Sequence, residues 1–287
     1  MLSYRHAFHA GNHADVLKHA VLFRIIASLL AKDKPFSYLD SHAGAGIYPL
    51  DGEWARKTGE SDGGILRILD QENPPEALKP YLELCARYRR EGNRYPGSPE
   101  IARDLARESD RLVLIELHPT EIENLRVNLS GDRRAHIHHR DGFSGLLALT
   151  PPDPRRGIAL MDPSFETLDD YARTAETLIA VHRRWPVGIL ALWYPIVPRR
   201  AGELALLKDR FAVSGIPGIL TAELQVREPP ENSGLDEGFG LVGSGMLVVN
   251  PPWKLEAELR DFLPWLAQTL GADGQGDSRI AWLSDPT

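Results

Sequence analysis

The sequence of 287 residues contains a single cysteine, Cys85. One cysteine excludes an intramolecular disulfide framework and a zinc site built from several cysteines. No run of about 18 apolar residues is present, so no membrane-spanning helix is predicted. The first residues, from Met1 to His6, also lack the apolar stretch of a secretory signal. These absences predict a protein of the reducing cytoplasm that has no membrane partner.

An excess of positive charge is missing as well. The formal net charge is −7, which disfavours a general nucleic-acid coat protein but leaves room for a local basic groove. Several groups of arginines could form such a groove, or could simply lie on solvated helix faces and turns. They are Arg87, Arg89, Arg90 and Arg94; Arg133, Arg134 and Arg140; and Arg183 and Arg184.

What the chain does contain is a regular alternation of strand and helix patterns. Helical spacing of apolar residues predicts a first helix that starts after Asn12 and ends near Ala31. Short apolar runs predict seven strands, at 36–40, 111–117, 135–140, 157–161, 188–195, 218–226 and 243–250. This alternation predicts an α/β fold with a mostly parallel, seven-stranded sheet and helices on both faces.

Residues 50–110 interrupt the alternation, because they show helical patterns where a second strand is expected. We therefore predict a main domain formed by residues 1–49 and 111–287, with an inserted helical subdomain at 50–110. Ser98, before Pro99, has the pattern of a helix N-cap.

The first predicted strand leads into a glycine turn. Gly44 and Gly46 permit a tight turn and a close approach of the backbone to a ligand. The third glycine of a dinucleotide-binding motif is absent, since position 49 is Pro49. The turn therefore speaks against a pyrophosphate site.

Acidic residues follow the next three strands, at the edge of the sheet where α/β proteins bind ligands. Glu116 suits the ribose hydroxyls of a nucleoside, and Asp141 beside the Gly142 N–H suits an adenine ring. Together with a glycine turn that binds no pyrophosphate, they suit S-adenosylmethionine. Taken singly, these acids could equally be helix caps or loop residues.

The fourth strand ends at Asp162-Pro163-Ser164-Phe165. Pro163 cannot donate a hydrogen bond to a sheet, so the strand stops there. The Asp162 carboxylate and the Asp162 or Pro163 carbonyl can accept the two protons of an exocyclic amine, and Phe165 can stack on the ring that bears it.

These features resemble the large-subunit rRNA adenine-N6 methyltransferases of the RlmJ family, over essentially the whole chain. The residues that carry the resemblance are the long stretch from Ser3 to His19, Leu39-Asp-Ser-His42-Ala-Gly-Ala-Gly46, Tyr95-Pro-Gly-Ser98-Pro, Glu116-Leu-His-Pro, Asp141-Gly142, Ala191-Leu-Trp-Tyr-Pro195 and Asn250-Pro-Pro-Trp-Lys-Leu255. The resemblance implies a class I, Rossmann-like methyltransferase that uses S-adenosylmethionine and acts on 23S ribosomal RNA. We expect a monomer.

The resemblance also implies roles for individual residues. An N-terminal segment and helix, residues 1–34, are expected to close the site, with Tyr4 and His6 contacting the substrate RNA. Asp162, Pro163 and Phe165 are the predicted catalytic residues. With the glycine turn included, the predicted cofactor-binding residues are Lys18, His19, His42, Gly44, Ser98, Glu116, Asp141, Gly142 and Asp162.

One departure from the family pattern concerns the catalytic strand end, where Asp-Pro-Pro-Tyr is expected and this chain has Ser164 and Phe165. Phe165 keeps the stacking surface and loses a hydroxyl, while Ser164 frees a backbone angle that proline fixes. Because Asp162 and Pro163 are unchanged, we expect activity to survive.

Asn250-Pro251-Pro252-Trp253 matches an amino-methyltransferase motif better than the 162–165 segment does. It ends the seventh predicted strand, which we expect to neighbour the sheet edge, away from the cofactor. We therefore interpret it as a strand stop in which Trp253 anchors the last helix.

Other functions compete with this interpretation. His9, His13 and Asp15 have residue types and helical spacing that suit a metal ion, as in a metal-dependent hydrolase. A DNA adenine-N6 methyltransferase would use the same strand ends, and a catalytically inactive relative would only bind RNA. Metal analysis, and methyl transfer to matched RNA and DNA, distinguish these alternatives.

Overall fold

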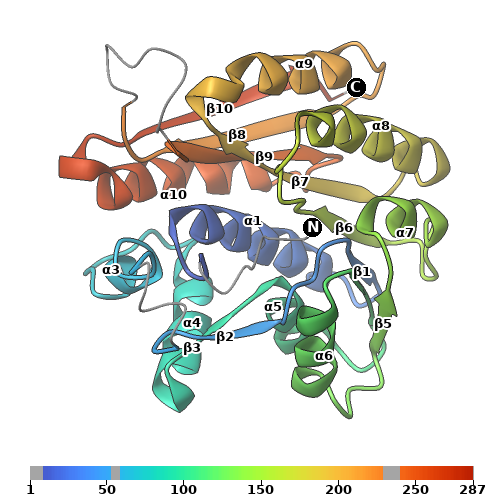
Figure 1. Ribbon diagram of the computed structural model, residues 1–287, viewed down its shortest axis with the longest axis horizontal. Coiled ribbons are helices and arrows are strands. Elements are labelled where there is room, and N and C mark those ends of the chain that lie inside the picture. The colour runs from blue at the N-terminus through green and yellow to red at the C-terminus, as the bar shows by residue number, and fades with distance from the viewer. Residues whose placement is uncertain (1–8, 53–58, 229–239, 287) are drawn as a thin grey trace.

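The computed structural model describes residues 9–52, 59–228 and 240–286, which form an α/β fold around one large sheet (Figure 1). Eight strands make the sheet, in the order β10-β8-β9-β7-β6-β1-β4-β5. Their bounds are β1 Ser37–Asp40, β4 Arg111–Glu116, β5 Ala135–His139, β6 Gly157–Met161, β7 Ile189–Ile196, β8 Ile219–Gln225, β9 Gly243–Val249 and β10 Asp277–Ser284.

All seven predicted strands are present, but the predicted number is wrong because β10 adds an eighth. β10 pairs antiparallel with β8 and forms one edge of the sheet. None of its residues is fully buried, since an edge strand has only one neighbour. Its sequence contains the apolar run Ile280-Ala281-Trp282-Leu283, so a strand signal was present and the prediction overlooked it.

The directions of the strands determine at which edge of the sheet the predicted site residues lie. Strands β5, β4, β1, β6 and β7 run parallel, so their carboxyl ends meet at one edge of the sheet. Strand β9 runs antiparallel to both β7 and β8. The residue that follows β9 therefore lies at the opposite edge from the residues that follow β1, β4, β5 and β6.

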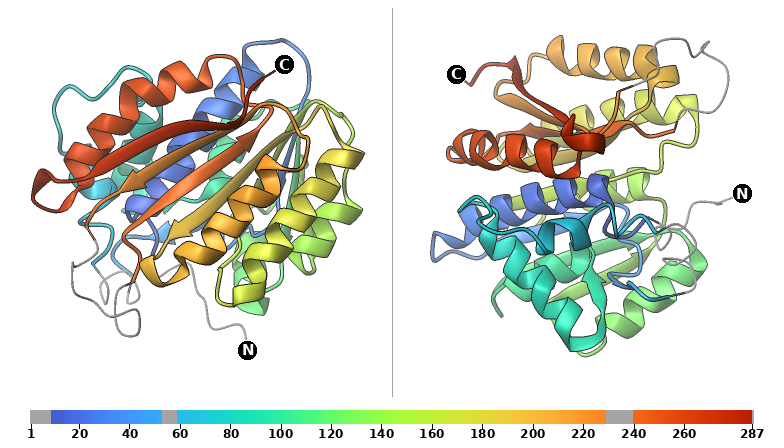
Figure 2. Two further views of the ribbon diagram at one scale, coloured as in Figure 1. Left: turned by 90° about the horizontal axis from the view of Figure 1, so that it is seen from above. Right: turned by 90° about the vertical axis from the view of Figure 1, so that its left-hand side faces the viewer.

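Helices cover both faces of the sheet (Figures 1 and 2). On one face lie α7 (Gly142–Ala148), α8 (Leu168–Arg184) and α9 (Ala201–Ala212), which pack on side chains such as Leu39. The neighbouring Tyr38 points to the other core, as the two-residue period of a strand requires. Helices of that second core are α1 (His13–Leu30), α4 (Lys79–Gly92), α5 (Ser98–Leu105), α6 (Pro119–Asn128) and α10 (Leu255–Leu270).

The stretch between β1 and β4 contains the predicted insertion. It includes a small antiparallel sheet of two strands, β2 (Ile47–Pro49) and β3 (Arg94–Pro96), and the helices α3 (Ile65–Leu69), α4 and α5. Side chains of α4 such as Tyr81 and Cys85 are buried in the same core as α1. The division into a main domain and an inserted subdomain at 50–110 stays a prediction.

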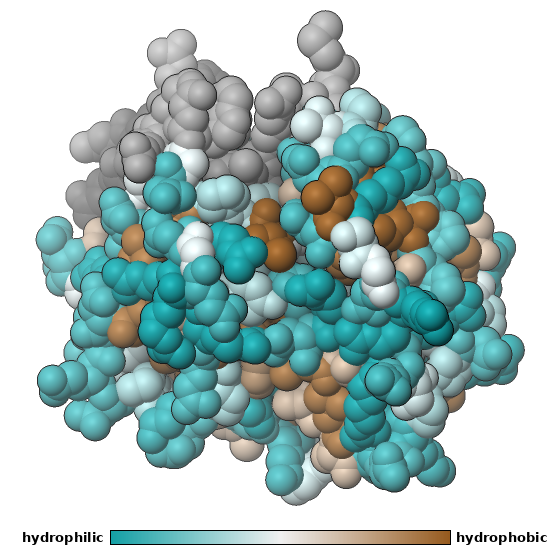
Figure 3. All heavy atoms as spheres, turned by 90° about the horizontal axis from the view of Figure 1, so that it is seen from below, coloured by the Kyte–Doolittle hydropathy of each residue, from teal (hydrophilic) through white to brown (hydrophobic). Residues whose placement is uncertain are grey.

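The face shown in Figure 3 is covered mainly by hydrophilic residues, with separate hydrophobic spots among them. None of the helices in the described parts of the chain is both long and apolar enough to cross a membrane.

Candidate active site

A cavity of about 270 Å³ opens at the carboxyl edge of the parallel strands. Pro163 lines it, and so do all nine residues predicted to bind a cofactor: Lys18, His19, His42, Gly44, Ser98, Glu116, Asp141, Gly142 and Asp162. We call it the first cavity. Tyr4 and His6, predicted to contact RNA, lie outside the described residues.

The glycine turn forms one wall of the first cavity. Gly44 and Gly46 have φ angles of 62° and 83°, in the left-handed region that favours glycine. The Gly44 N–H donates to Oε2 of Glu116 at 2.7 Å, and the His118 N–H donates to Oε1 at 2.6 Å. Each carboxylate oxygen is thus held by the backbone, and each keeps a second lone pair for a hydroxyl donor.

Asp141 forms the neighbouring wall and caps α7. Its Oδ1 accepts hydrogen bonds from the Ser144 N–H and from Arg173, both at 2.9 Å. Burial raises the pKa of Asp141, but these donors and the Arg173 charge outweigh burial and lower it overall. The Arg173 guanidinium also lies 4.0 Å from the centre of the Phe143 ring. Asp141 is therefore an ionised acceptor beside an aromatic surface.

Behind the first cavity lies Asp40, a fully buried carboxylate at the end of β1. It accepts hydrogen bonds from the Tyr38 hydroxyl at 2.6 Å, the Ser98 hydroxyl at 2.7 Å and the His42 N–H at 3.2 Å. Burial raises its pKa to about 6, although these donors oppose the rise. Asp40 fixes Ser98 and the start of the glycine turn.

The position of Ser98 corrects one prediction. Gly97, rather than Ser98, is the N-cap of α5, and Ser98 is the first helical residue. Its hydroxyl instead donates to Asp40 and lines the first cavity. Asp40 was not among the predicted site residues, although it ends the first predicted strand and lies in the Leu39–Gly46 stretch that carries the resemblance.

Helix α1 brings a buried cation to the site. As predicted, Asn12 caps the helix, and its side chain accepts from the N–H groups of Ala14 and Asp15. The Lys18 ammonium is buried between two carboxylates, with Nζ 2.8 Å from Oδ1 of Asp15 and 2.5 Å from Oδ2 of Asp162. Asp162 is therefore held in one orientation.

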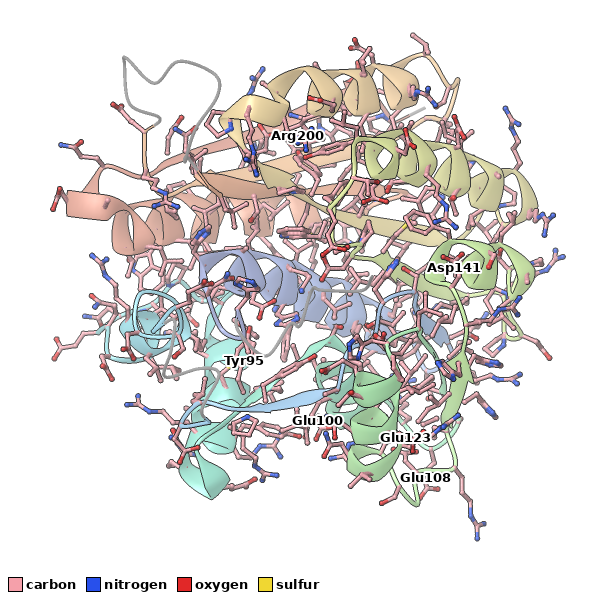
Figure 4. The ribbon with its side chains drawn as sticks, viewed as in Figure 1. Tyr95, Glu100, Glu108, Glu123, Asp141 and Arg200 are labelled. Carbon is pink, nitrogen blue, oxygen red and sulfur yellow. The ribbon has the colours of Figure 1, made fainter. Side chains whose placement is uncertain are left out.

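His19, the next residue on α1, is held by Tyr95 of strand β3. Its Nδ1 lies 2.6 Å from the Tyr95 hydroxyl, which in turn lies 2.9 Å from the Tyr81 hydroxyl. Figure 4 labels Tyr95 on β3, below α1. These contacts connect residues of the 50–110 segment to the first cavity.

A second cavity of about 260 Å³ adjoins the first, and Lys18, Asp162 and Ser164 line both. Its wall is aromatic. The Phe165 ring centre lies 4.7 Å from that of Tyr171 on α8 and 6.1 Å from that of Trp193 on β7. The three rings pack against one another and form an aromatic wall on which a flat ligand can stack.

Phe165 has a φ angle of 50°, which is unusual for a bulky residue. Such a conformation costs free energy and persists only where the surroundings enforce it, often at functional sites. Here the turn brings the Phe165 ring into the second cavity while Asp162 faces both cavities.

Tyr171, Trp193, Arg199 and Arg200 of the second cavity were not among the predicted site residues. A signal existed for Trp193, because it comes near the end of a predicted parallel strand. The sequence gave no such signal for Tyr171, because the apolar residues of α8 have the spacing of any packed helix.

The second proline motif lies at the other edge of the sheet. The Asn250 side chain donates to the carbonyls of Pro186 at 2.8 Å and Gly188 at 2.9 Å, which supports its interpretation as a strand stop. Two expectations were wrong. Strand β9 lies between β7 and β8 rather than beside the edge, and Trp253 is 85% exposed, so it does not anchor α10 by burial.

The residues of the metal alternative are engaged otherwise. His9 Nδ1 lies 3.0 Å from both oxygens of Glu60, and this hydrogen bond raises the His9 pKa. Burial lowers the pKa of His13 to about 4. Across residues 9–52, 59–228 and 240–286, no group of three or more His, Cys, Asp or Glu side chains is arranged to hold a metal ion.

The charges that line the first cavity indicate its ligand. Two side chains are basic, Lys18 and Arg173. Six are acidic: Glu116, Glu121, Asp141, Asp162, Glu166 and Asp170. Such a lining repels a pyrophosphate and attracts a ligand that carries positive charge.

Known proteins resemble this chain along almost its whole length. It is 45% identical over 285 residues to ribosomal RNA large subunit methyltransferase J of Escherichia coli, and 40% identical over 287 residues to the protein of that name from Haemophilus influenzae, with 99% of each chain covered. A crystal structure from Legionella pneumophila shares 30% identity, with a TM-score of 0.83 over 95% of this chain and 98% of that one.

A family model described as "Ribosomal RNA large subunit methyltransferase D, RlmJ" matches residues 33–284. The match includes β1, the glycine turn, every acidic strand end of the first cavity and the 162–165 segment. The chain therefore belongs to the RlmJ family of ribosomal RNA large subunit methyltransferases, and its fold is that of a class I methyltransferase.

Proposed function

We propose that this protein transfers a methyl group from S-adenosylmethionine to N6 of a specific adenine in 23S ribosomal RNA, with the base flipped out of its stack. The observation that carries the proposal is the position of Asp162, which lines both adjoining cavities. The names of the two curated relatives support ribosomal RNA as the substrate. Such a substrate places the activity in the cytoplasm.

The first cavity suits S-adenosylmethionine. Glu116 offers two backbone-anchored oxygens to a ribose diol, and Asp141 beside Phe143 offers an acceptor and a ring to adenine. The acidic lining suits a molecule that carries a sulfonium and an ammonium group and no phosphate. The Gly44 turn leaves room for the amino-acid end.

The second cavity suits the acceptor base. A flipped adenine must recover the stacking that it loses, a cost of a few kcal/mol. Phe165, Tyr171 and Trp193 offer aromatic surface for this purpose. The exocyclic amine would then lie at Asp162, where the two cavities meet.

The chemistry follows from this placement. When bound, S-adenosylmethionine would supply an electrophilic methyl group on its sulfonium, and breaking of the S–CH3 bond would release S-adenosylhomocysteine, a neutral thioether. The adenine amine is a poor nucleophile because its lone pair is conjugated with the ring. Acceptance of its two protons by the Asp162 carboxylate and the Pro163 carbonyl holds the nitrogen in line for attack, and Asp162 takes the released proton. Lys18, fixed by Asp15, keeps the carboxylate aimed at the amine.

The remaining roles are part of the same proposal. His42 and Ser98 border the cofactor, and Tyr4 and His6 contact the RNA from the N-terminal segment. His19 binds the cofactor in an orientation set by Tyr95. Ser164 replaces the family proline without removing an acceptor, so the enzyme is active, and we expect it to act as a monomer.

The test uses 23S ribosomal RNA from cells that lack this protein. Labelled S-adenosylmethionine should transfer its methyl group to one adenine, which mass mapping of the RNA identifies. Matched DNA should remain unlabelled; preferential labelling of DNA would indicate a DNA adenine-N6 methyltransferase. RNA binding without any transfer would indicate an inactive relative.

A further inference from the structure

Two adjacent arginines stand at the outer part of the second cavity. Arg199 and Arg200 end the short 3-10 turn Pro198–Arg200, which connects β7 to α9, and both line the cavity. Figure 4 labels Arg200 at the start of α9, away from the Asp141 side of the molecule. Pro198 stiffens the turn, so the two side chains leave a fixed backbone.

Both guanidinium groups are available to a ligand. Arg199 is exposed and makes no ion pair within the described residues. Among the residues that the structure describes, Arg200 pairs with Glu203 alone, and the Nη1–Oε1 distance of 3.6 Å is too long for a hydrogen bond. Arg173 differs from these two arginines, because its guanidinium group already donates a hydrogen bond to Asp141 at 2.9 Å.

The two arginines lie beside the aromatic wall. Burial is the main cause that raises the pKa of Tyr171 to about 12, and the positive charges of Arg200 and Arg199 oppose that rise. The arginines therefore act on the same ring that contacts Phe165. The second cavity therefore offers hydrogen-bond acceptors at Asp162, aromatic rings at Phe165, Tyr171 and Trp193, and two cations on its more exposed side.

This combination suits a nucleotide, which has an amine-bearing base, a sugar and a phosphate. Arginine suits the last group, because its planar fork of donors matches a phosphate and can bind it bidentately. The two cavities thus differ in charge: the lining of the first is mainly acidic, whereas the second has two guanidinium groups on its more exposed side.

We propose that Arg199 and Arg200 bind the RNA phosphates that flank the flipped adenosine, and so position that nucleotide in the second cavity. This inference rests on the proposed function, because it takes the second cavity as the site of the acceptor base. It assigns a phosphodiester-binding site to the turn after β7.

The test measures binding rather than turnover. A labelled RNA hairpin that contains the mapped adenosine is titrated by fluorescence anisotropy against the wild type and the double variant Arg199→Gln/Arg200→Gln. The double variant should bind at least about tenfold more weakly at low salt, and the salt dependence of log K should fall by about one per arginine. Arg155→Gln, an exposed arginine just before the amino end of β6 and so at the other edge of the sheet, is the matched control and should bind like the wild type.

A second arm locates the contact. The same hairpin is made with neutral methylphosphonate linkages on both sides of the target adenosine. They should weaken binding to the wild type and have no further effect on the double variant. S-adenosylmethionine affinity, measured by calorimetry, should stay within about twofold, because neither arginine lines the first cavity.

The outcomes separate the two proposals. Wild-type methylation together with unchanged RNA affinity of the double variant, or an equal loss on the neutral linkages in both proteins, would overturn the phosphate site and leave the proposed function standing. Phosphate-dependent binding through the arginines without any methyl transfer by the wild type would support the phosphate site and reject the proposed function.

Discussion

Two strands of the sheet end in similar sequences whose residues lie in different surroundings. Strand β6 ends at Asp162-Pro163-Ser164-Phe165, and β9 ends at Asn250-Pro251-Pro252-Trp253. Both turns contain a residue in the left-handed region, Phe165 with φ 50° and Asn250 with φ 53°. Yet Asp162 lines two cavities, whereas Asn250 donates to the Pro186 and Gly188 carbonyls.

Strand direction explains the difference. Strand β6 runs parallel to β1 and β4, so Asp162 reaches the edge where the glycine turn and Glu116 lie. Strand β9 runs antiparallel to β7, so Asn250 reaches the other edge. A four-residue motif therefore acquires its function from the edge of the sheet to which its strand delivers it.

The largest expected effect concerns Asp162. Asp162→Asn keeps a hydrogen-bond acceptor but removes the proton acceptor, so the rate of methyl transfer in a single turnover should fall by about 10²- to 10⁴-fold. Binding of S-adenosylmethionine should persist, because Glu116 and Asp141 are unchanged. A rate within about threefold of the wild type would show that Asp162 takes no proton.

A smaller loss is expected at Phe165. Phe165→Ala removes stacking surface worth about 1–3 kcal/mol, so the RNA concentration that gives half-maximal rate should rise by about 5- to 100-fold. Phe165→Gly is the matched variant, because glycine tolerates the φ of 50° without the ring. Similar losses in both variants assign the effect to stacking; recovery in the glycine variant would assign it to backbone strain.

Cofactor binding at the sheet edge that carries Asp162 should also depend on pH, through Asp40 on β1. As pH falls through about 6, Asp40 gains a proton and loses an acceptor for Ser98 or the His42 N–H. The dissociation constant of S-adenosylmethionine should therefore rise several-fold between pH 7 and pH 5. The rise should be much smaller in Asp40→Asn, and calorimetry at both pH values compares the two proteins.

Protonation of Asp40 should weaken cofactor binding but stabilise the fold. Because its folded-state pKa of about 6 lies above the ordinary value of 3.8, ionisation of Asp40 opposes folding. Its contribution to the free energy of unfolding should be largest below pH 4 and should fall as pH rises to about 6. Denaturant titrations of the wild type and Asp40→Asn should converge at low pH; a constant gap across this range would contradict the assignment.

The smallest effect on activity is expected at Asn250. Asn250→Ala loses two hydrogen bonds and places alanine at a φ of 53°, so the free energy of unfolding should fall by about 2–3 kcal/mol. Transfer per folded molecule should stay within about twofold. Asn250→Gly, which relieves the backbone cost, should be less destabilised.

Much of this site could be predicted from the sequence, because parallel strands bring their carboxyl ends together whatever their lengths. Gly44, Glu116, Asp141 and Asp162 were each recognisable as strand ends, and they line one cavity. The family resemblance added Lys18, His19 and Ser98, which come from helices that no strand rule places.

What could not be predicted depends on tertiary packing. The antiparallel pair of β2 with β3 joins segments separated by more than 40 residues, and strands of three residues give no signal for such pairing. Asp15 appeared only as a candidate metal ligand, because its contact with Lys18 near Asp162 requires the folded chain.

The contrast between the two strand ends is tested most directly by single-turnover methyl transfer to unmethylated 23S ribosomal RNA by Asp162→Ala and Asn250→Ala, measured side by side on folded protein. We expect transfer to be nearly abolished in Asp162→Ala and to stay within about twofold of the wild type in Asn250→Ala. Full transfer by Asp162→Ala would contradict the assignment of the reaction to the end of β6.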